Sequence, residues 1–230
     1  MSGFTYRLER HSAPHAAKDS TLVAAVAHIF SHSFGTNPKT GQPYRLGPKT
    51  TRERLQGTTD LIIGFEDSTS SAMGYIYGRT IESPQGLMVW IDSLAVEPEH
   101  RRKGLGTKLV STLILAHASC RWVGCATPNP VAALVITRAI GGHAYAGECS
   151  PPTELVRMIE SVRGRIPDLR GAEFNATRLL VRTSFNPTST GDSKDWIPPH
   201  PSEPPPWWSS LAHLPSEHEA LLVIDRHETV

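Results

Sequence analysis

The sequence lacks three features that mark specialised classes of protein. It has only 3 cysteines in 230 residues, and the spacing of Cys120, Cys125 and Cys149 fits neither a disulfide framework nor a paired zinc motif. No apolar run is long enough to cross a bilayer, and the first ten residues contain no apolar signal core. The 23 basic and 22 acidic residues nearly cancel, which disfavours binding to nucleic acid or to an anionic membrane. We therefore expect a soluble, globular, cytoplasmic protein with neither partner.

Apolar periodicity in the sequence predicts a mixed α/β fold. Two apolar runs, 61–65 and 72–78, flank a polar turn and are typical of an antiparallel hairpin. Asp19 and Ser20 offer an N-cap for a helix that continues to a stop at Gly35. Further strands are predicted over 4–8, 87–96, 122–126, 178–185 and 219–225, and further helices over 51–56, from 104 onward, 130–140 and 153–162.

A segment rich in Pro, Ser and Trp, 187–215, interrupts this pattern. Proline lacks the N–H group that helices and sheets need, so the segment cannot form a regular element. Its tryptophans, Trp196, Trp207 and Trp208, favour packing over full disorder because such large apolar surfaces normally pack somewhere. We therefore predict one α/β domain over 1–186, a loop packed on it over 187–215, and a last strand in 216–230 that completes the same domain.

The segment 91–107 carries the most informative pattern: an apolar strand, a tight turn, a basic loop with glycines, and a helix start. The first turn of a helix has unpaired N–H groups and a partial positive charge, so it can seat a phosphate. Gly104 and Gly106 remove side chains where an anion must approach the backbone. The pattern matches neither a P-loop nor the dinucleotide-binding fingerprint. It predicts a diphosphate site, with a purely structural turn as the alternative.

The residues Arg101-x-x-Gly104-x-Gly106, which follow the strand residues Leu94 to Val96, resemble the acyl-CoA pyrophosphate loop of the GNAT N-acetyltransferases. The resemblance is strong from about 87 to 117 and weaker over 122–145. It implies the GNAT fold, which is a mixed, mostly antiparallel central sheet with two splayed parallel strands and helices on both faces. It also implies that acetyl-CoA binds as a co-substrate.

The resemblance further implies which residues would hold acetyl-CoA. Backbone groups of Leu94, Ala95 and Val96 would pair with the pantetheine arm, where a bulge splays this strand from the strand over 122–126. Asn129 would touch the same arm, and Arg138 could reach a CoA phosphate. The residues implied at the pyrophosphate are Arg101, Arg102, Lys103, Gly104, Leu105, Gly106 and Thr107.

The usual proton donor of the family, a tyrosine in the helix over 130–140, is missing here. Alignment places Thr137 or Ile136 at its position, and a threonine hydroxyl is a far weaker acid than a phenol. Tyr145, His143 or Tyr75 could replace it, as could water. The catalytic acid therefore stays open at this point.

The general base is also open, because attack by an amine requires a neutral nitrogen and removal of a proton. Asp92 is the first candidate, since it lies on the strand near the expected bulge and would face the acceptor. That Asp92 merely satisfies nearby backbone donors is an equally good interpretation. Ser93 and His143 follow as candidates, whereas Glu97 and Glu99 flank a turn and are expected to be solvated.

The remaining histidines and the cysteines are assigned no catalytic or metal-binding role. His28 and His32 are four residues apart, as are His11 and His15. No third histidine, cysteine or carboxylate follows either pair at a spacing typical of metal sites, so we predict no metal site. The residues predicted to be core side chains are Cys120, Cys125, Tyr75, Tyr77 and Trp90. For the three aromatic residues, the alternative is that one or more of them lines the acceptor pocket.

Together these expectations describe an N-acetyltransferase that moves an acetyl group from acetyl-CoA to a small-molecule or peptide amine by direct attack in a ternary complex. The loop over 34–47, the hairpin and late segments would form the acceptor pocket. A GNAT-fold enzyme of another class, such as a decarboxylase, and a non-catalytic CoA-binding module are the alternatives. Monomer and homodimer both remain open.

Overall fold

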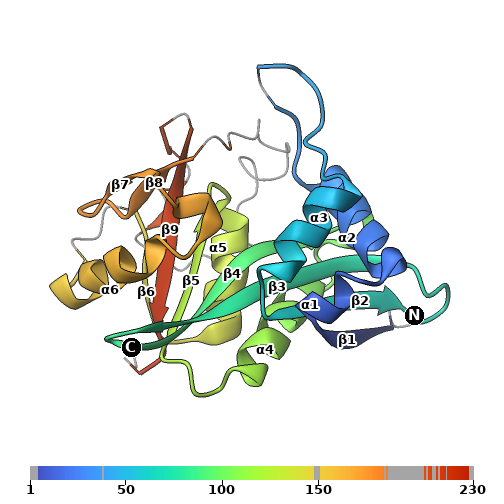
Figure 1. Cartoon of the computed structure of the whole chain (residues 1–230), viewed down its shortest axis with the longest axis horizontal. Helices are drawn as coiled ribbons and strands as arrows, with labels where there is room; N and C mark the ends of the chain where they lie inside the picture. Colours follow the sequence, from blue (N-terminus) through green and yellow to red (C-terminus); the bar gives the residue numbers. More distant parts are fainter. Residues whose placement is uncertain are drawn as a thin grey trace. The chain divides into compact units, whose positions relative to one another are not determined.

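A computed structural model gives the structure of the chain (Figure 1). It describes residues 5–37, 39–147, 151–183, 185, 205, 207–208, 211, 213–215 and 217–227. The chain forms two compact units, the first from Met1–Thr80 with Ile91–Ala118 and the second from Ile81–Trp90 with Ser119–Val230. Within the described ranges, no helix has the length and apolar character needed to cross a membrane.

The first unit contains strands in the order β1 (Tyr6–Ser12), β2 (Asp60–Glu66), β3 (Ala72–Ser83) and β4 (Gly86–Val96), and both β3 and β4 also contribute residues to the second unit. The pairs β1–β2 and β2–β3 are antiparallel. The helices are α1 (Ala13–Ala16), α2 (Ser20–Ser33), α3 (Pro48–Gln56) and α4 (Leu105–Ala116), and a 3-10 turn, Pro98–His100, precedes α4. The carboxylate of Asp19 caps α2 as predicted, accepting from the amides of Thr21 and Leu22.

Helices cover both faces of the strands of the first unit (Figure 1), which are part of one nine-stranded sheet. Successive side chains of a strand point to opposite faces. Leu61 and Ile63 of β2 share one core cluster with α1, α2 and α3, whereas Gly64 lies against Leu105 of α4. The helix α4 therefore packs on the face opposite α2 and α3.

The second unit continues the strand order from β4 through β5 (Trp122–Thr127), β9 (His218–Asp225), β8 (Leu180–Arg182) and β7 (Glu173–Asn175), and β6 (His143–Tyr145) also pairs with β9. The pair β4–β5 is parallel, and the pairs of β9 with β5, β6 and β8 are antiparallel. Its helices are α5 (Pro130–Ile140) and α6 (Thr153–Arg163), with a 3-10 turn at Pro167–Leu169. Gly124 gives room to two large β4 side chains, since a Cβ there would lie 2.7 Å from Met88 and 2.8 Å from Trp90.

Most predicted elements are confirmed, and α5 has the predicted bounds. The strand predicted over 178–185 is shorter, because only Leu180–Arg182 pairs as β8. Among the described residues, the short helix α1, the short strands β6 and β7, and the two 3-10 turns were not predicted. Elements of three or four residues are too short to display a period, so only their long-range partners define them.

The Pro/Trp-rich segment lies mostly outside the described residues, Trp196 included, and its predicted domain boundaries stay a prediction. Trp207 within it is buried. Cys149 also lies outside the described residues, whereas Cys120 and Cys125 are buried free thiols, as predicted. Burial raises the pKa of the Cys125 thiol to about 12, so this thiol is an inert core side chain.

Candidate functional site

The connection from β4 to α4 has the geometry of an anion site. Gly104 is the N-cap of α4 with φ +82°, and no side chain of the described residues caps this helix end. The first turn, Leu105 to Thr107, therefore presents backbone N–H groups that the helix itself does not use. A Cβ at Gly104 would meet nothing within 4 Å, and Arg102 and Lys103 beside it are exposed cations. The end of the helix is open, positive and reachable from solvent.

Two glycines hold this helix start in place. Gly64 of β2 and Gly74 of β3 face each other in the strand register. The buried Leu105 fills the space that they leave, because a Cβ at Gly64 would lie 2.9 Å from one of its methyl groups and a Cβ at Gly74 would lie 3.2 Å from the other. The sequence analysis missed this role. The only available signal was the presence of glycine inside two apolar strands, which often marks a close approach.

The Arg101 side chain donates hydrogen bonds to backbone carbonyls of the first unit. Its Nε donates to the Val96 carbonyl at 3.0 Å, and its Nη2 donates to the Ser33 carbonyl at 3.2 Å. The Ser33 hydroxyl also donates to the Val96 carbonyl, at 3.3 Å. The guanidinium thus ties the loop to the end of β4 and to the C-terminal end of α2, where the helix dipole favours a cation. This contact differs from the predicted place of Arg101 at a pyrophosphate.

The backbone of β4 divides its hydrogen-bonding groups between two edges. The Glu97 amide donates to Met73 of β3 at 2.9 Å, and the Ala95 carbonyl lies beside Gly74 of β3. Since alternate residues of a strand direct their N–H and C=O groups to opposite edges, Leu94 and Val96 face away from β3. Of the three residues predicted to pair with a pantetheine arm, Ala95 is directed to β3 instead.

Asp92 does not present an open carboxylate. Both of its oxygens accept from the Arg79 guanidinium, with Nε at 2.9 and 3.1 Å and Nη2 at 2.8 Å, and its side chain is only 7% exposed. The bidentate ion pair with Arg79 thus occupies both carboxylate oxygens. The contact agrees with a structural interpretation of Asp92, although its donor is a side chain rather than the backbone.

Ser93, the next residue, contacts the same strand. Its hydroxyl lies 3.0 Å from the hydroxyl of Tyr75, which is fully buried and whose pKa is raised well above its usual value by burial and by Tyr77. Tyr75 and Arg79 are four residues apart on β3 and therefore lie on the same face. They contact Ser93 and Asp92, which are consecutive on β4 and would lie on opposite faces of a regular strand. Strict alternation does not allow this pattern, whereas a β-bulge produces it.

The second unit contains the remaining predicted ligands. Asn129 is the N-cap of α5, and its Oδ1 accepts from the amides of Val131 and Ala132 at 2.9 and 3.4 Å. Arg138 is exposed in the last turn of α5. At the position of the missing tyrosine, the hydroxyl of Thr137 donates to the Leu134 carbonyl at 3.1 Å. Ile136, the other aligned residue, is buried.

The two predicted proton-transfer residues of β6 lie together. His143 and Tyr145 are two positions apart and so share a face of the strand, with ring centroids 4.5 Å apart. Tyr145 is buried in the core cluster of the second unit, whereas His143 is exposed. The structure thus brings a phenol and an imidazole into contact.

Comparison with known proteins agrees with this fold. The family model for acetyltransferases of the GNAT family matches residues 23–141, more than half of the chain. No curated protein matches the sequence. Among solved structures, a glucosamine N-acetyltransferase region in a fungal multi-domain GH3 beta-N-acetylglucosaminidase has a TM-score of 0.50 at 14% identity, covering 70% of this chain and 21% of that chain.

Two bacterial enzymes are also similar. Diaminobutyrate acetyltransferase EctA from Paenibacillus lautus, solved with its substrate and coenzyme A, is 14% identical with a TM-score of 0.45, over 97% of this chain and 96% of that chain. The ribosomal-protein-S18-alanine N-acetyltransferase of Escherichia coli is 16% identical with a TM-score of 0.44, over 64% of this chain and 86% of that chain. Structural likeness at such identities speaks to the fold alone.

Proposed function

Because the chain belongs to the acetyltransferase (GNAT) family, we propose that it transfers an acetyl group from acetyl-CoA to an amine. In this reaction the amine nitrogen attacks the thioester carbonyl directly in a ternary complex. A C–N bond forms and the C–S bond breaks. The nitrogen loses a proton to a base, and the departing sulfur receives one from an acid. The acceptor is a small-molecule or peptide amine.

The open start of α4 is the observation that carries this proposal. Its first-turn amides, the exposed Arg102 and Lys103, and the empty space at Gly104 together suit a diphosphate group. Gly106 and Thr107 add two of the amides, and Leu105 adds a third while its side chain anchors the helix. Arg101 acts as a positioning residue, since its guanidinium holds the loop on Val96 and Ser33.

The pantetheine arm would pair with the edge of β4 that faces away from β3. Leu94 and the amide of Val96 are the groups directed there, since the Val96 carbonyl already accepts from Arg101 and Ser33. In the second unit, the cap formed by Asn129 uses Oδ1, so its Nδ2 is the atom that would donate to the arm. Arg138 would contact a CoA phosphate through its exposed guanidinium.

Proton transfer is assigned to β6 rather than to Asp92. The phenol of Tyr145 would protonate the departing thiolate in place of the tyrosine missing from α5, and His143 would take the proton of the amine. Asp92 would orient Arg79, to which it is bound through both oxygens. The expected result is that Tyr145→Phe lowers kcat at least tenfold while leaving the CoA dissociation constant within a factor of two.

The test of the cofactor site is calorimetric titration of the purified chain with CoA. Gly104→Glu places bulk and negative charge at the open helix start, and we expect it to weaken CoA binding at least a hundredfold. Gly171→Glu is the matched control, because Gly171 also has a positive φ (+73°) and open space at its Cβ but belongs to the second unit rather than to the unit that contains α4. Retention of CoA affinity in Gly104→Glu would overturn the placement of the pyrophosphate.

The chemistry is tested by incubating the chain with acetyl-CoA and a panel of amines, and then with malonyl-CoA alone. Thiol release that depends on an amine supports acetyl transfer. Release of carbon dioxide from malonyl-CoA without amine consumption would replace the proposal by decarboxylation. CoA binding without either reaction would reduce the protein to a binding module.

A further inference from the structure

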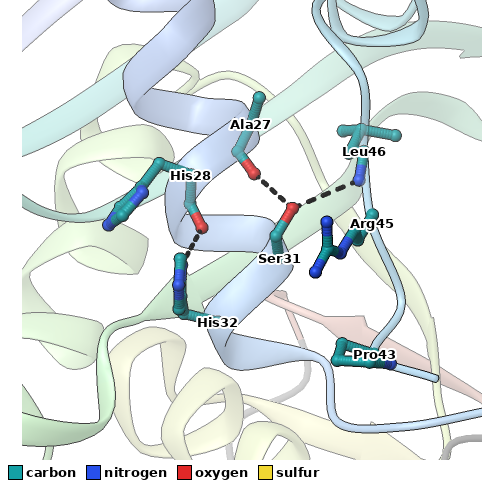
Figure 2. A pocket seen from close by; sticks show the side chains of 7 residues that line it. All are labelled: Ala27, His28, Ser31, His32, Pro43, Arg45 and Leu46. Carbon is teal, nitrogen blue, oxygen red and sulfur yellow. Dashed lines mark hydrogen bonds between the residues drawn. The ribbon is translucent and has the colours of Figure 1, made fainter. Parts of the chain in front are cut away.

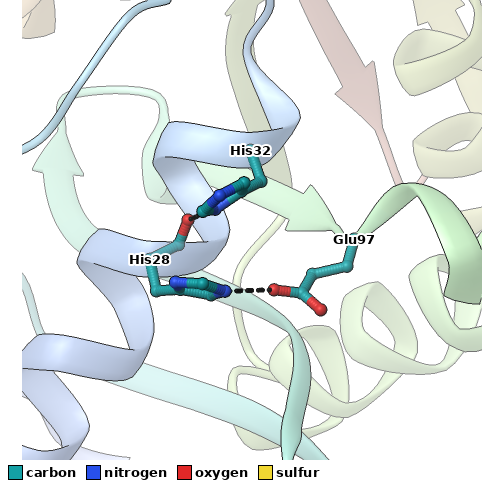
Figure 3. Close-up of side chains that lie close together, drawn as sticks. All are labelled: His28, His32 and Glu97. Atoms are coloured by element: carbon teal, nitrogen blue, oxygen red, sulfur yellow. Dashed lines mark hydrogen bonds and ion pairs between the residues drawn. The ribbon is translucent and has the colours of Figure 1, made fainter.

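A cluster of metal-ligand side chains lies where α2 approaches the end of β4 (Figure 3). His28 and His32 are one helical turn apart on α2, with ring centroids 4.1 Å apart. Glu97 follows directly after β4, and its Oε1 lies 3.3 Å from Nε2 of His28. The ligand atoms of all three side chains lie within 4.8 Å of one another. The third ligand that the sequence spacing did not reveal is therefore Glu97.

The hydrogen bond that His32 makes through Nδ1 leaves Nε2 as the imidazole nitrogen that can bind a metal. Nδ1 of His32 lies 2.8 Å from the His28 carbonyl, and a carbonyl can only accept, so Nδ1 carries the proton. Neutral His32 therefore has its lone pair on Nε2. Metal-binding histidines commonly donate their other N–H to a carbonyl in this way, which fixes the tautomer and the ring orientation.

Glu97 brings a negative charge that solvent hardly screens. The prediction that it is solvated is wrong, since only 8% of the residue is exposed. A buried carboxylate directed at two exposed imidazoles is an arrangement that a bound cation stabilises.

The distances suit a tetrahedral ion. Zinc binds histidine nitrogen and carboxylate oxygen at about 2.0–2.2 Å, which separates neighbouring ligand atoms by about 3.4 Å. The 3.3 Å between His28 and Glu97 already matches this separation, and the ligand atom of His32 lies within 4.8 Å of both others. Glu99 and His100 also bring ligand atoms within 4.8 Å of that of Glu97.

A pocket beside the two histidines leaves room for a further ligand (Figure 2). It has a volume of about 450 Å³, and both His28 and His32 line it. Its opposite wall is held to α2 by Ser31, whose hydroxyl donates to the Ala27 carbonyl at 2.8 Å and accepts from the Leu46 amide at 3.3 Å. Water or a small anion could therefore reach the ion.

We propose that His28, His32 and Glu97 bind a divalent transition-metal ion of the Zn²⁺ class, with water or a neighbouring side chain as the fourth ligand. The ion would join α2 to the end of β4, immediately before the turn that leads to Gly104. Because its ligands come from both elements and are brought together only by folding, the bound ion would stabilise the folded chain by mass action. The alternative is a plain ion pair between protonated His28 and Glu97.

The test is a competition titration of the metal-free full-length chain with Zn²⁺ and a chromophoric zinc indicator. We expect one ion per chain with a dissociation constant below 1 μM, an order-of-magnitude value for a site with three protein ligands. Co²⁺ should give the intense visible absorption of a tetrahedral site. His32→Asn and Glu97→Gln should each weaken binding at least tenfold.

His15→Asn is the matched control. His11 and His15 repeat the four-residue spacing in the sequence, but His11 lies in β1 and His15 in α1, so they do not share a helix face. This variant should bind zinc like the native chain. The proposal fails if no stoichiometric ion binds, or if the double variant His28→Asn, His32→Asn binds with unchanged affinity. No CoA is present, so the result does not depend on the proposed function.

Discussion

Glu219 of β9 is a buried carboxyl whose protonation state is coupled to folding. The Thr183 hydroxyl donates to it at 2.6 Å, but burial, with a smaller contribution from Asp168, raises its pKa to about 7. Between pH 4.5 and about pH 7, Glu219 therefore holds a proton in the folded chain that it has released in the unfolded chain. Above the unfolded pKa of 4.5, folding becomes less favourable as the pH rises, and the loss is complete above about pH 7.

Glu219→Gln should remove this dependence, because an amide does not titrate. We expect the variant to gain about 3 kcal/mol in unfolding free energy between pH 4.5 and pH 8 relative to the native chain. Urea unfolding at a series of pH values measures this. Glu173→Gln is the control, since Glu173 is 76% exposed and should leave the profile unchanged. Parallel pH profiles for the native chain and Glu219→Gln would contradict the burial argument.

At the scale of elements, the facing glycines of β2 and β3 decide where α4 begins. A Cβ at Gly74 would lie 2.9 Å from the Ala95 carbonyl, which is backbone and cannot move aside, whereas a Cβ at Gly64 would meet only side-chain methyl groups. We therefore expect Gly74→Ala to cost about 2–3 kcal/mol of unfolding free energy and Gly64→Ala about 1 kcal/mol. Gly57→Ala, with ordinary contacts of 3.5 Å and longer, is the control and should be near neutral.

The measurement is urea unfolding of the three alanine variants. An equal cost for Gly74→Ala and Gly57→Ala would show that the Ala95 backbone beside Gly74 accommodates a methyl group. If the start of α4 also binds the pyrophosphate, Gly74→Ala should weaken CoA binding more than Gly57→Ala does, because Leu105 would be pushed away from the sheet.

At the scale of the whole molecule, the last strand holds the second unit together. β9 pairs with β5, β6 and β8, so it lies inside the sheet. Arg121 at the start of β5 binds Asp225 at the end of β9 at 2.6 Å, across 104 residues of sequence. Such contacts cannot form until the C-terminal part of the chain is present, and their loop-closure entropy makes folding slow.

Leu222→Pro in β9 should prevent the second unit from folding, since proline removes a ladder hydrogen bond in an interior strand. Glu173→Pro at the first position of the edge strand β7 is the matched control and should fold. Hydrogen exchange monitored by mass spectrometry distinguishes them, with β5 and β9 protected in the control and unprotected in Leu222→Pro. Native-like protection of β9 in Leu222→Pro would contradict its central role.

The sequence by itself determined the larger elements, the position of the basic glycine loop, and the family. Apolar periods, the Asp19 cap and the glycine at the start of α4 depend on residues close in the chain, so local rules suffice to predict them. The family prediction is confirmed by the match over residues 23–141, and the predicted fold class by the sheet with helices on both faces.

Only the tertiary structure decided which polar groups meet. It placed Arg79 on Asp92, Ser33 and Val96 around Arg101, and two histidines of α2 beside Glu97. The amino-acid sequence determines which side chains are ionisable. The partner of an ionisable side chain depends on how distant segments pack, since Glu97 and His28 lie far apart in the sequence but 3.3 Å apart in the structure.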